Sequence, residues 1–337
     1  MANLTVMDFE KSIAELDANL AKLRQVALDR ANPENTPELH AQIAELDQHR
    51  TAVLEAIYAH LTPWDKVLLA RHERRPYTLD YIGAVFTEWQ ELHGDRLFAD
   101  DGAIVAGLAR LDGWPVAVIG HQKGRDIRQR QHRNFGYARP EGYRKAGRVM
   151  KTAAKFGMPV ITLVDTAGAA ADVAADERGI SEAIARAMFD MATLTVPIVS
   201  VIIGEGGSGG ALGLAVADRV LMLEHSIYSV IAPEGCAAIL WRDPEMKAKA
   251  ADQLNLTAQR ARELGIIDDI IPEPLGGAHR DWEGAGANLK RALTCHLDLL
   301  LGTPPAVLTA ARYEKFRRMG RFGEAPPPQD GGDGEAG

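Results

Sequence analysis

Cysteine is scarce in this chain of 337 residues: Cys236 and Cys295 are the only two, and they stand far apart. Two isolated cysteines cannot form a disulfide framework or a four-cysteine zinc site. We therefore expect no metal site and a reducing, cytoplasmic compartment. No run of 18 apolar residues occurs, which argues against a transmembrane helix. The first ten residues lack a basic stretch followed by an apolar one, so we expect no signal peptide.

Positive charge is also in deficit, because the net charge is −8. This balance argues against general nucleic-acid binding. Residues 121–151 are an exception, with ten Lys or Arg residues against Asp126 and Glu141. That run is suited to a polyanionic ligand or to a solvated loop. The last fifteen residues carry four acids and no base, which is typical of a disordered tail.

Apolar residues recur every three or four positions over residues 9–26 and again over 39–57, with Pro33 and Pro37 between the two runs. This spacing predicts two amphipathic helices. A short connection makes them an antiparallel helical hairpin, which we assign to residues 1–62. The hairpin either packs against the body of the protein or contacts another subunit.

Short β-rich runs alternate with helical runs after Tyr77, which predicts an α/β core over residues 63–284. A C-terminal helical segment is expected over 285–320 and a disordered acidic Pro/Gly tail over 321–337. The expected strands are 103–111, 115–120, 159–165, 197–203, 219–224 and 227–231, and the expected helices are 141–156, 179–194, 209–217 and 288–301.

Five glycines gather in residues 203–211, between an apolar strand and a helix. Glycine lets the backbone approach a ligand closely, and N–H groups at a helix start attract negative charge. Three functions fit this segment. Gly204, Gly206 and Gly209 match the dinucleotide-binding pattern, with Glu224 as the ribose ligand. Ser208 matches a nucleophile elbow, with His225 or His279 as its base, although a helix cap is the simpler role.

The third function is an oxyanion hole formed by backbone N–H groups of Gly206 and Gly207. Such a site needs a second donor from another loop. The segment 165–169 follows the strand expected at 159–165, so the two loops lie at the same end of a sheet. The chemistry would then depend on the backbone, without a particular side chain.

Several specific motifs occur along the chain: RPYTLDY at 75–81, GHQKGR at 120–125, RNFG at 133–136, PEGYRKA at 140–146, GEGGSGG at 204–210, YSVI at 228–231, PEGCA at 233–237 and IIPEPLGGAH at 270–279. Together they resemble the alpha subunit of the bacterial acetyl-CoA carboxylase carboxyltransferase, over residues 5–318. The resemblance implies a crotonase-type (ClpP/crotonase) ββα superhelix behind the N-terminal helical hairpin.

The resemblance also implies the reaction and the partners. The family transfers a carboxyl group from carboxybiotin on the biotin carboxyl carrier protein to acetyl-CoA, which gives malonyl-CoA for fatty acid biosynthesis. Its active site lies between alpha and beta subunits in an α2β2 heterotetramer, and the beta subunit carries zinc. Biotin carboxylase, the ATP-consuming component, is the remaining partner. No membrane or specific nucleic acid is implied.

By the same resemblance, the alpha subunit stabilises the biotin ureido oxyanion and the beta subunit the thioester enolate. Because the biotin nitrogen takes the α-proton, no protein base is required. The implied catalytic donors are the amides of Gly206, Gly207 and Ala169. The implied substrate-binding residues are Gly168, Ala170, Lys123, Arg125 and Arg128, the three basic ones through coenzyme A phosphates. For His121 we favour a structural hydrogen bond over proton transfer.

The chain departs from the family at one loop, where D-T-P-G-A-Y-P-G is replaced by DTAGAAAD at 165–172. Loss of the prolines leaves the loop more flexible, and Ala170 removes an aromatic wall. Asp172 adds negative charge near the expected oxyanion, at a cost on the order of 1–4 kcal/mol. The alternatives are therefore a divergent paralogue with another acyl-CoA substrate, or a catalytically impaired assembly subunit.

Overall fold

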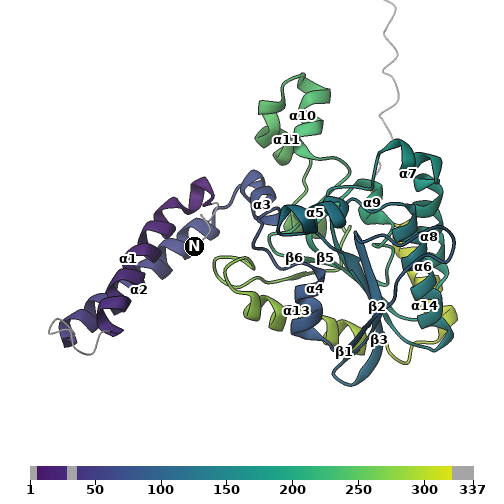
Figure 1. Cartoon of the computed structure of the whole chain (residues 1–337), viewed down its shortest axis with the longest axis horizontal. Coiled ribbons are helices and arrows are strands. Elements are labelled where there is room, and N and C mark those ends of the chain that lie inside the picture. Colours follow the sequence, from purple (N-terminus) through teal and green to yellow (C-terminus); the bar gives the residue numbers. More distant parts are fainter. Residues whose placement is uncertain (1–5, 29–35, 321–337) are drawn as a thin grey trace, which may run out of the picture.

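The computed structural model describes residues 6–28 and 36–320. An N-terminal helical arm projects from an α/β body, and a small helical lobe stands above that body (Figure 1). The predicted tail at 321–337 lies outside the described residues. Within them, no helix combines the length and apolarity needed to cross a membrane.

The strands are β1 (Thr87–Glu91), β2 (Ile104–Leu111), β3 (Trp114–His121), β4 (Val160–Thr166), β5 (Ile198–Gly207), β6 (Arg219–Leu223), β7 (Ile227–Ser229) and β8 (Asp269–Ile271). The α-helices are α1 (Lys11–Leu28), α2 (Pro37–Tyr58), α3 (Pro63–Ala70), α4 (Thr78–Val85), α5 (Ile127–His132), α6 (Pro140–Lys155), α7 (Val173–Glu177), α8 (Ile180–Thr193), α9 (Ser208–Leu212), α10 (Pro233–Trp241), α11 (Lys247–Gln253), α12 (Ala258–Glu263), α13 (Trp282–Asp298) and α14 (Pro305–Arg317). Short 3-10 turns lie at Asp8–Glu10, Asn134–Gly136 and Pro244–Met246.

One mixed sheet forms the centre of the body, in the order β1-β2-β3-β4-β5-β6-β8, and β7 pairs with the end of β5. The first three strands are antiparallel neighbours, and the pairs from β3 onward are parallel. Every residue of β4 is buried. Burial on both faces is typical of a parallel strand covered by helices on each side. The α/β expectation is confirmed.

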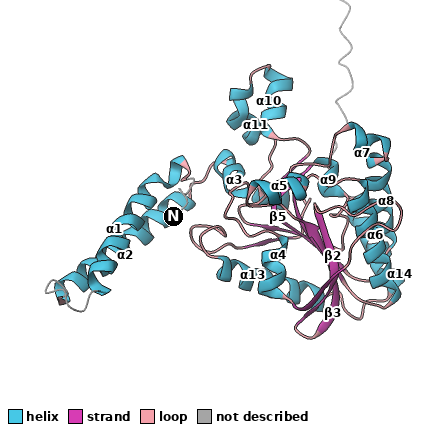
Figure 2. Cartoon of the chain, viewed as in Figure 1, coloured by secondary structure: helices cyan, strands magenta, loops and turns pink. Residues whose placement is uncertain are grey.

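Helices cover both faces of the sheet (Figure 2), and an apolar cluster lies between the helices and the sheet on each face. On one face, Tyr143 and Met150 of α6 and Met191 of α8 pack against the strands. On the other face, Tyr81 of α4 and Leu293 of α13 do so. Helices α13 and α14 thus belong to the core, and α13 begins at Trp282. The expected boundary at 284 therefore falls inside a helix.

The hairpin of α1 and α2 is confirmed, and it extends away from the body instead of lying on it (Figure 1). Its base is joined to the body by polar contacts. The Tyr58 hydroxyl lies 2.9 Å from both Glu10 Oε1 and the carbonyl oxygen of Gly276. Arg280 Nε donates to Glu10 Oε1 at 2.8 Å. Glu10 itself is only 2% exposed.

A buried ion pair joins three segments: the one that follows α3, strand β5, and the one that follows β8. Arg75 Nη1 donates to Glu273 Oε2 at 3.0 Å, and Arg75 Nε donates to the carbonyl oxygen of Ile203 in β5 at 2.7 Å. Burial acts to raise the pKa of Glu273, but the Arg75 charge, with lesser help from His225 and Ala278, lowers it to about 2.

We expect the Arg75–Glu273 pair to make the free energy of unfolding fall as the pH becomes acidic. A carboxylate whose pKa falls from its ordinary 4.5 to about 2 stabilises the folded state above pH 4.5 and loses that contribution as the pH falls through 2. Glu273→Gln should lower the free energy of unfolding by about 3–5 kcal/mol at pH 7. Urea unfolding from pH 7 to 3 should show the gap between wild type and variant narrowing below pH 4.5. A gap that stays constant would contradict the assignment.

Candidate active site

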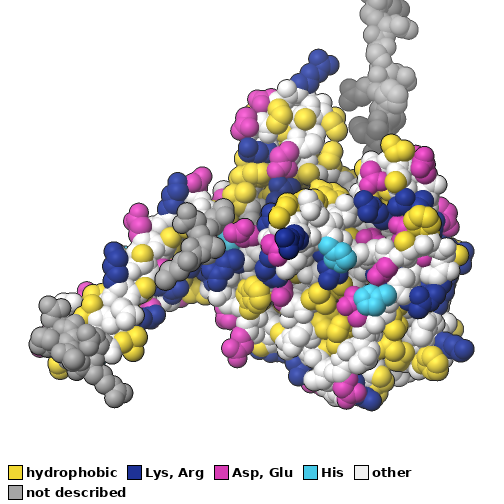
Figure 3. Space-filling view, in the orientation of Figure 1, with side chains coloured by type: hydrophobic (Ala, Val, Ile, Leu, Met, Phe, Trp, Pro, Cys, Tyr) yellow, Lys and Arg dark blue, Asp and Glu magenta, His cyan; other side chains and the backbone are white. Residues whose placement is uncertain are grey.

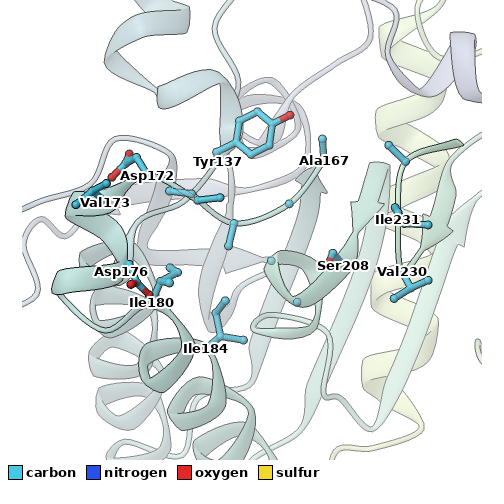
Figure 4. A pocket seen from close by; sticks show the side chains of 17 residues that line it. Tyr137, Ala167, Asp172, Val173, Asp176, Ile180, Ile184, Ser208, Val230 and Ile231 are labelled. Carbon is cyan, nitrogen blue, oxygen red and sulfur yellow. The ribbon is translucent and has the colours of Figure 1, made fainter. Parts of the chain in front are cut away.

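Two segments that are far apart in the sequence meet at the carboxyl end of β4 and β5. The strands are parallel neighbours, with Thr166 opposite Gly206. The loop that follows β4 and the short helix α9 that follows β5 line a cavity of about 700 Å³. In Figure 4, Tyr137 and Ala167 lie above Ser208, and Val230 and Ile231 face them from the far wall. The convergence expected from the sequence is therefore observed.

Close backbone contact explains two of the glycines. A Cβ atom on Gly207 would lie 2.2 Å from the carbonyl oxygen of Ala167, although the φ of −95° at Gly207 suits any residue. A Cβ atom on Gly210 would lie 2.6 Å from the amide nitrogen of Ala169. Both positions require glycine because the other loop occupies the space of a side chain.

Of the three predicted donors, Ala169 lines the cavity, whereas Gly206 and Gly207 do not. Ala169 lies between the lining residues Gly168 and Ala170. Its N–H group donates to no acceptor in the described part of the chain, whereas the Ala170 amide donates to the carbonyl oxygen of Ala138 at 2.9 Å. Ala169 thus offers a free donor at the cavity wall.

Gly206 and Gly207 are part of β5, where the sequence suggested a loop. Gly206 pairs with residues of both β4 and β7, and Gly207 pairs with Ser229 of β7. The glycine-rich residues that line the cavity are the next three, Ser208, Gly209 and Gly210. They open α9, and amides in the first turn of a helix have no intrahelical acceptor. The free donors on this side therefore lie one to four residues after the predicted pair.

The helix expected at 209–217 is much shorter, since α9 ends at Leu212. Such a helix is too short for a dinucleotide-binding unit. Glu224, the expected ribose ligand, instead accepts a hydrogen bond from the Glu273 amide at 3.1 Å. These two observations disfavour the dinucleotide interpretation.

Ser208 lacks the surroundings of a nucleophile. Its φ of 52° is unusual for a non-glycine residue. Among the described residues, its exposed side chain has no hydrogen-bond partner and no histidine beside it. His225 packs against Tyr58, and His279 against His72. The two candidate bases thus lie at the base of the hairpin, which disfavours a hydrolase.

Two of the three basic residues expected to bind phosphate are engaged in internal contacts. Lys123 Nζ lies 2.8 Å from both Asp165 Oδ1 and Glu205 Oε2. Arg125 pairs with Asp80 at 2.7 Å, and its guanidinium lies between the rings of Tyr77 and Trp282. Arg128 is exposed in α5. Of the three, Arg128 remains accessible to a phosphate.

The hydrogen bond expected for His121 is not found. The His121 side chain is fully buried, and neither ring nitrogen has a partner among the described residues. Burial, assisted by the charge of Lys123, lowers the pKa of His121 to about 3. The ring is therefore neutral at pH 7, which excludes a role as a positive charge.

Asp172 has a structural role in the altered loop. Its carboxylate Oδ1 accepts a hydrogen bond from the Ala175 amide at 2.8 Å and so caps α7. Arg139 lies 3.5 Å from the other oxygen. The Ala175 amide, followed by Arg139, lowers the pKa of Asp172. Asp172 thus stays ionised, and Arg139 offsets part of its charge, which reduces the repulsion that the sequence suggested.

The chain belongs to the acetyl co-enzyme A carboxylase carboxyltransferase-like family, whose model matches residues 6–320. It is 53% identical over 324 residues to the acetyl-coenzyme A carboxylase carboxyl transferase subunit alpha of Geobacter metallireducens, covering 96% of this chain and 100% of the relative. The subunit of the same name from Burkholderia multivorans is 52% identical over 323 residues, with 96% and 98% covered.

Solved structures with the same fold support the crotonase-type expectation. A transcarboxylase 12S chain, with methylmalonyl-coenzyme A bound in its crystal structure, aligns with a TM-score of 0.53 and 18% identity, over 76% of this chain and 44% of that chain. A chain of a Pseudomonas malonate decarboxylase hetero-tetramer in complex with coenzyme A has a TM-score of 0.53 and 18% identity, over 63% and 85%. At this identity the likeness concerns the fold alone.

Gly207→Ala should separate the two loops of the cavity. Because the new methyl group would overlap the carbonyl of Ala167, we expect stability to fall by about 1–3 kcal/mol and carboxyl transfer to fall at least about tenfold. Gly83→Ala is the matched control, since a Cβ atom there meets nothing within 4 Å and Gly83 lies in α4. Thermal unfolding and turnover should be measured for both. Equal behaviour of the two variants would contradict the steric account.

Asp172→Asn separates the capping role from the charge. Asn caps helices as well as Asp does, so the melting temperature should stay close to that of wild type and turnover should change by less than about threefold. Asp172→Ala, which removes the cap as well, should lower the melting temperature by about 2 °C. A large rise in turnover for Asp172→Asn, measured at constant ionic strength, would show that the charge opposes the reaction.

Proposed function

We propose that this chain acts as the alpha subunit of an acetyl-CoA carboxylase carboxyltransferase. It would transfer the carboxyl group from carboxybiotin on a carrier protein to acetyl-CoA, in a reducing cytoplasm. The proposal rests on the match of nearly the whole chain to this family, with 53% identity to one of its members. The cavity at the carboxyl ends of β4 and β5 supports it.

The cavity suits the biotin side of such a reaction. When the bond between the biotin ureido nitrogen and the carboxyl carbon breaks, negative charge develops on the ureido oxygen. Free backbone donors at Ala169 and in the first turn of α9 are suited to stabilise that charge, and each donor is typically worth about 10²–10³ in rate. Ile180, Ile184 and Ile231 line the same cavity and offer apolar surface to a ring.

The reaction also develops negative charge on the thioester oxygen, which requires a second oxyanion site. The α-carbon of acetyl-CoA loses a proton to the ureido nitrogen, passes through an enolate and bonds to the released carboxyl carbon. The enolate oxygen needs its own donors. The rim of the cavity is open and exposes Tyr137 (39%), Val173 (75%) and Val230 (75%). An apolar rim of this kind fits contact with a beta subunit that supplies the second site in an α2β2 assembly.

Not every predicted residue keeps its role in this proposal. Gly207 serves by holding the strand end in close contact with Ala167, and Gly206 by its close contact with Tyr228 of β7. Gly168 and Ala170 line the cavity beside the donor. Among the basic residues, Arg128 is the one we retain for coenzyme A phosphates. Zinc, if required, would belong to the beta subunit.

The decisive experiment is malonyl-CoA formation from acetyl-CoA and carboxylated carrier protein. We expect turnover when the chain is co-purified with its beta subunit and none with either subunit alone, measured by mass spectrometry. Propionyl-CoA should be offered in parallel, because preference for it would favour the divergent-paralogue alternative. A stable complex that carboxylates neither thioester would contradict the proposal and favour an assembly subunit.

A further inference from the structure

A buried cluster of charges lies directly behind the cavity. Lys123 follows the end of β3, Asp165 lies in β4, and Glu205 lies among the glycines of β5. The ammonium group of Lys123 is 2.8 Å from one oxygen of each carboxylate. The Glu205 amide donates to Asp165 Oδ1 at 2.9 Å. The Lys123 side chain thus links the carboxyl ends of β3, β4 and β5, which are neighbours in the sheet.

The cluster continues to the helices around the site. Arg71, which follows α3, donates from Nε to Glu205 Oε1 at 2.7 Å. The same guanidinium donates from Nη1 to Glu234 Oε1 in the first turn of α10. Both oxygens of Glu205 therefore have cationic partners, and α10 is linked to the strand that leads into α9.

The fit around these charges is tight on both sides. A Cβ atom on Gly204 would lie 2.4 Å from Asp165 Oδ1, and one on Gly136 would lie 2.8 Å from Cγ of Lys123. Asp165 is 1% exposed and Glu205 is 7% exposed. The side chains have little room to rearrange, so removal of the cation leaves two buried carboxylates facing each other.

The positions of the backbone donors depend on these strand ends. Ala169 follows Asp165 by four residues, and α9 begins three residues after Glu205. We propose that Lys123 is a positioning residue that fixes the distance between the Ala169 amide and the first-turn amides of α9, through its ion pairs with Asp165 and Glu205. The inference deepens the proposed function, on which it rests, and removes Lys123 from the phosphate-binding residues.

Four variants of the full chain, each co-purified with the beta subunit, test the proposal: Lys123→Met, Lys123→Arg, Glu205→Gln and Arg312→Met. The last is a matched control, because Arg312 forms a comparably buried pair with Asp218 at 2.7 Å and does not line the cavity. Two readouts are needed: steady-state turnover, and amide hydrogen exchange of segments 165–171 and 203–210.

We expect Lys123→Met to lower kcat by about 10- to 100-fold, because donors displaced by about 1 Å lose transition-state stabilisation. The KM for acetyl-CoA should stay within about threefold, since ground-state binding does not use these donors. Exchange should accelerate in both segments. Lys123→Arg should recover part of kcat, and Glu205→Gln should fall between wild type and Lys123→Met. Arg312→Met should unfold at a lower temperature but keep kcat and the exchange of both segments.

The two readouts separate failure of this inference from failure of the proposed function. If wild type shows no carboxyl transfer, hydrogen exchange still tests whether Lys123 holds the two segments together. Unchanged exchange in Lys123→Met would overturn the inference, as would unchanged kcat in an active wild-type background. A rise in the KM for acetyl-CoA at constant kcat would overturn it in favour of phosphate binding.

Discussion

Buried charge at the carboxyl ends of β4 and β5 is the constraint on which the site depends. The Lys123 and Arg75 side chains each bridge carboxylates or carbonyls from separate segments, and almost none of this surface meets water. Desolvation of such ions costs several kcal/mol each, so apolar side chains would stabilise these positions at least as well. Apolar packing lacks direction, however. Ion pairs with fixed partners specify where each strand ends, and the loops that line the cavity begin at those ends.

The helical arm obeys a different constraint. Apart from its base, its two helices pack mainly on each other. At the base, polar contacts through Glu10, Tyr58 and Arg280 join the arm to the body, beside the ring contact of Tyr58 with His225 (Figure 3 shows the charged surface of the arm). A polar joint fixes orientation through a few directed bonds and adds little apolar burial. The arm is therefore an appendage to the core, and the sheet with its two apolar layers holds the site without it. Of the two roles that the sequence left open, packing against the body is limited to the base in the described residues, which favours a subunit contact for the remainder of the arm.

Much of the fold was predictable because it depends on local patterns. Strands β2, β3, β4 and β6 were found within one residue at each end by their β-rich runs, as were α6 and α8 by their helical runs, whereas β5 runs four residues past its expected end. The site was less accessible. The expected strand ended at residue 203, but pairing with β7 extends β5 through Gly206 and Gly207. The partners of Lys123 lie 42 and 82 residues away. The capping role of Asp172, by contrast, was readable from an Asp just before a short helical run.

The proposed division of the active site between two chains is consistent with what the cavity contains. Its lining includes two carboxylates, Asp172 and Asp176, and one phenol, Tyr137, and these offer no cationic side chain for a developing oxyanion. Ala169 and the first residues of α9 line the same cavity, whereas carboxyl transfer to a thioester develops charge on two separate oxygens. In the proposed reaction, this cavity would stabilise one of them. Because the rim is apolar and open, the second set of donors is best supplied by a partner that closes the cavity, which also excludes water from the carboxyl group during transfer.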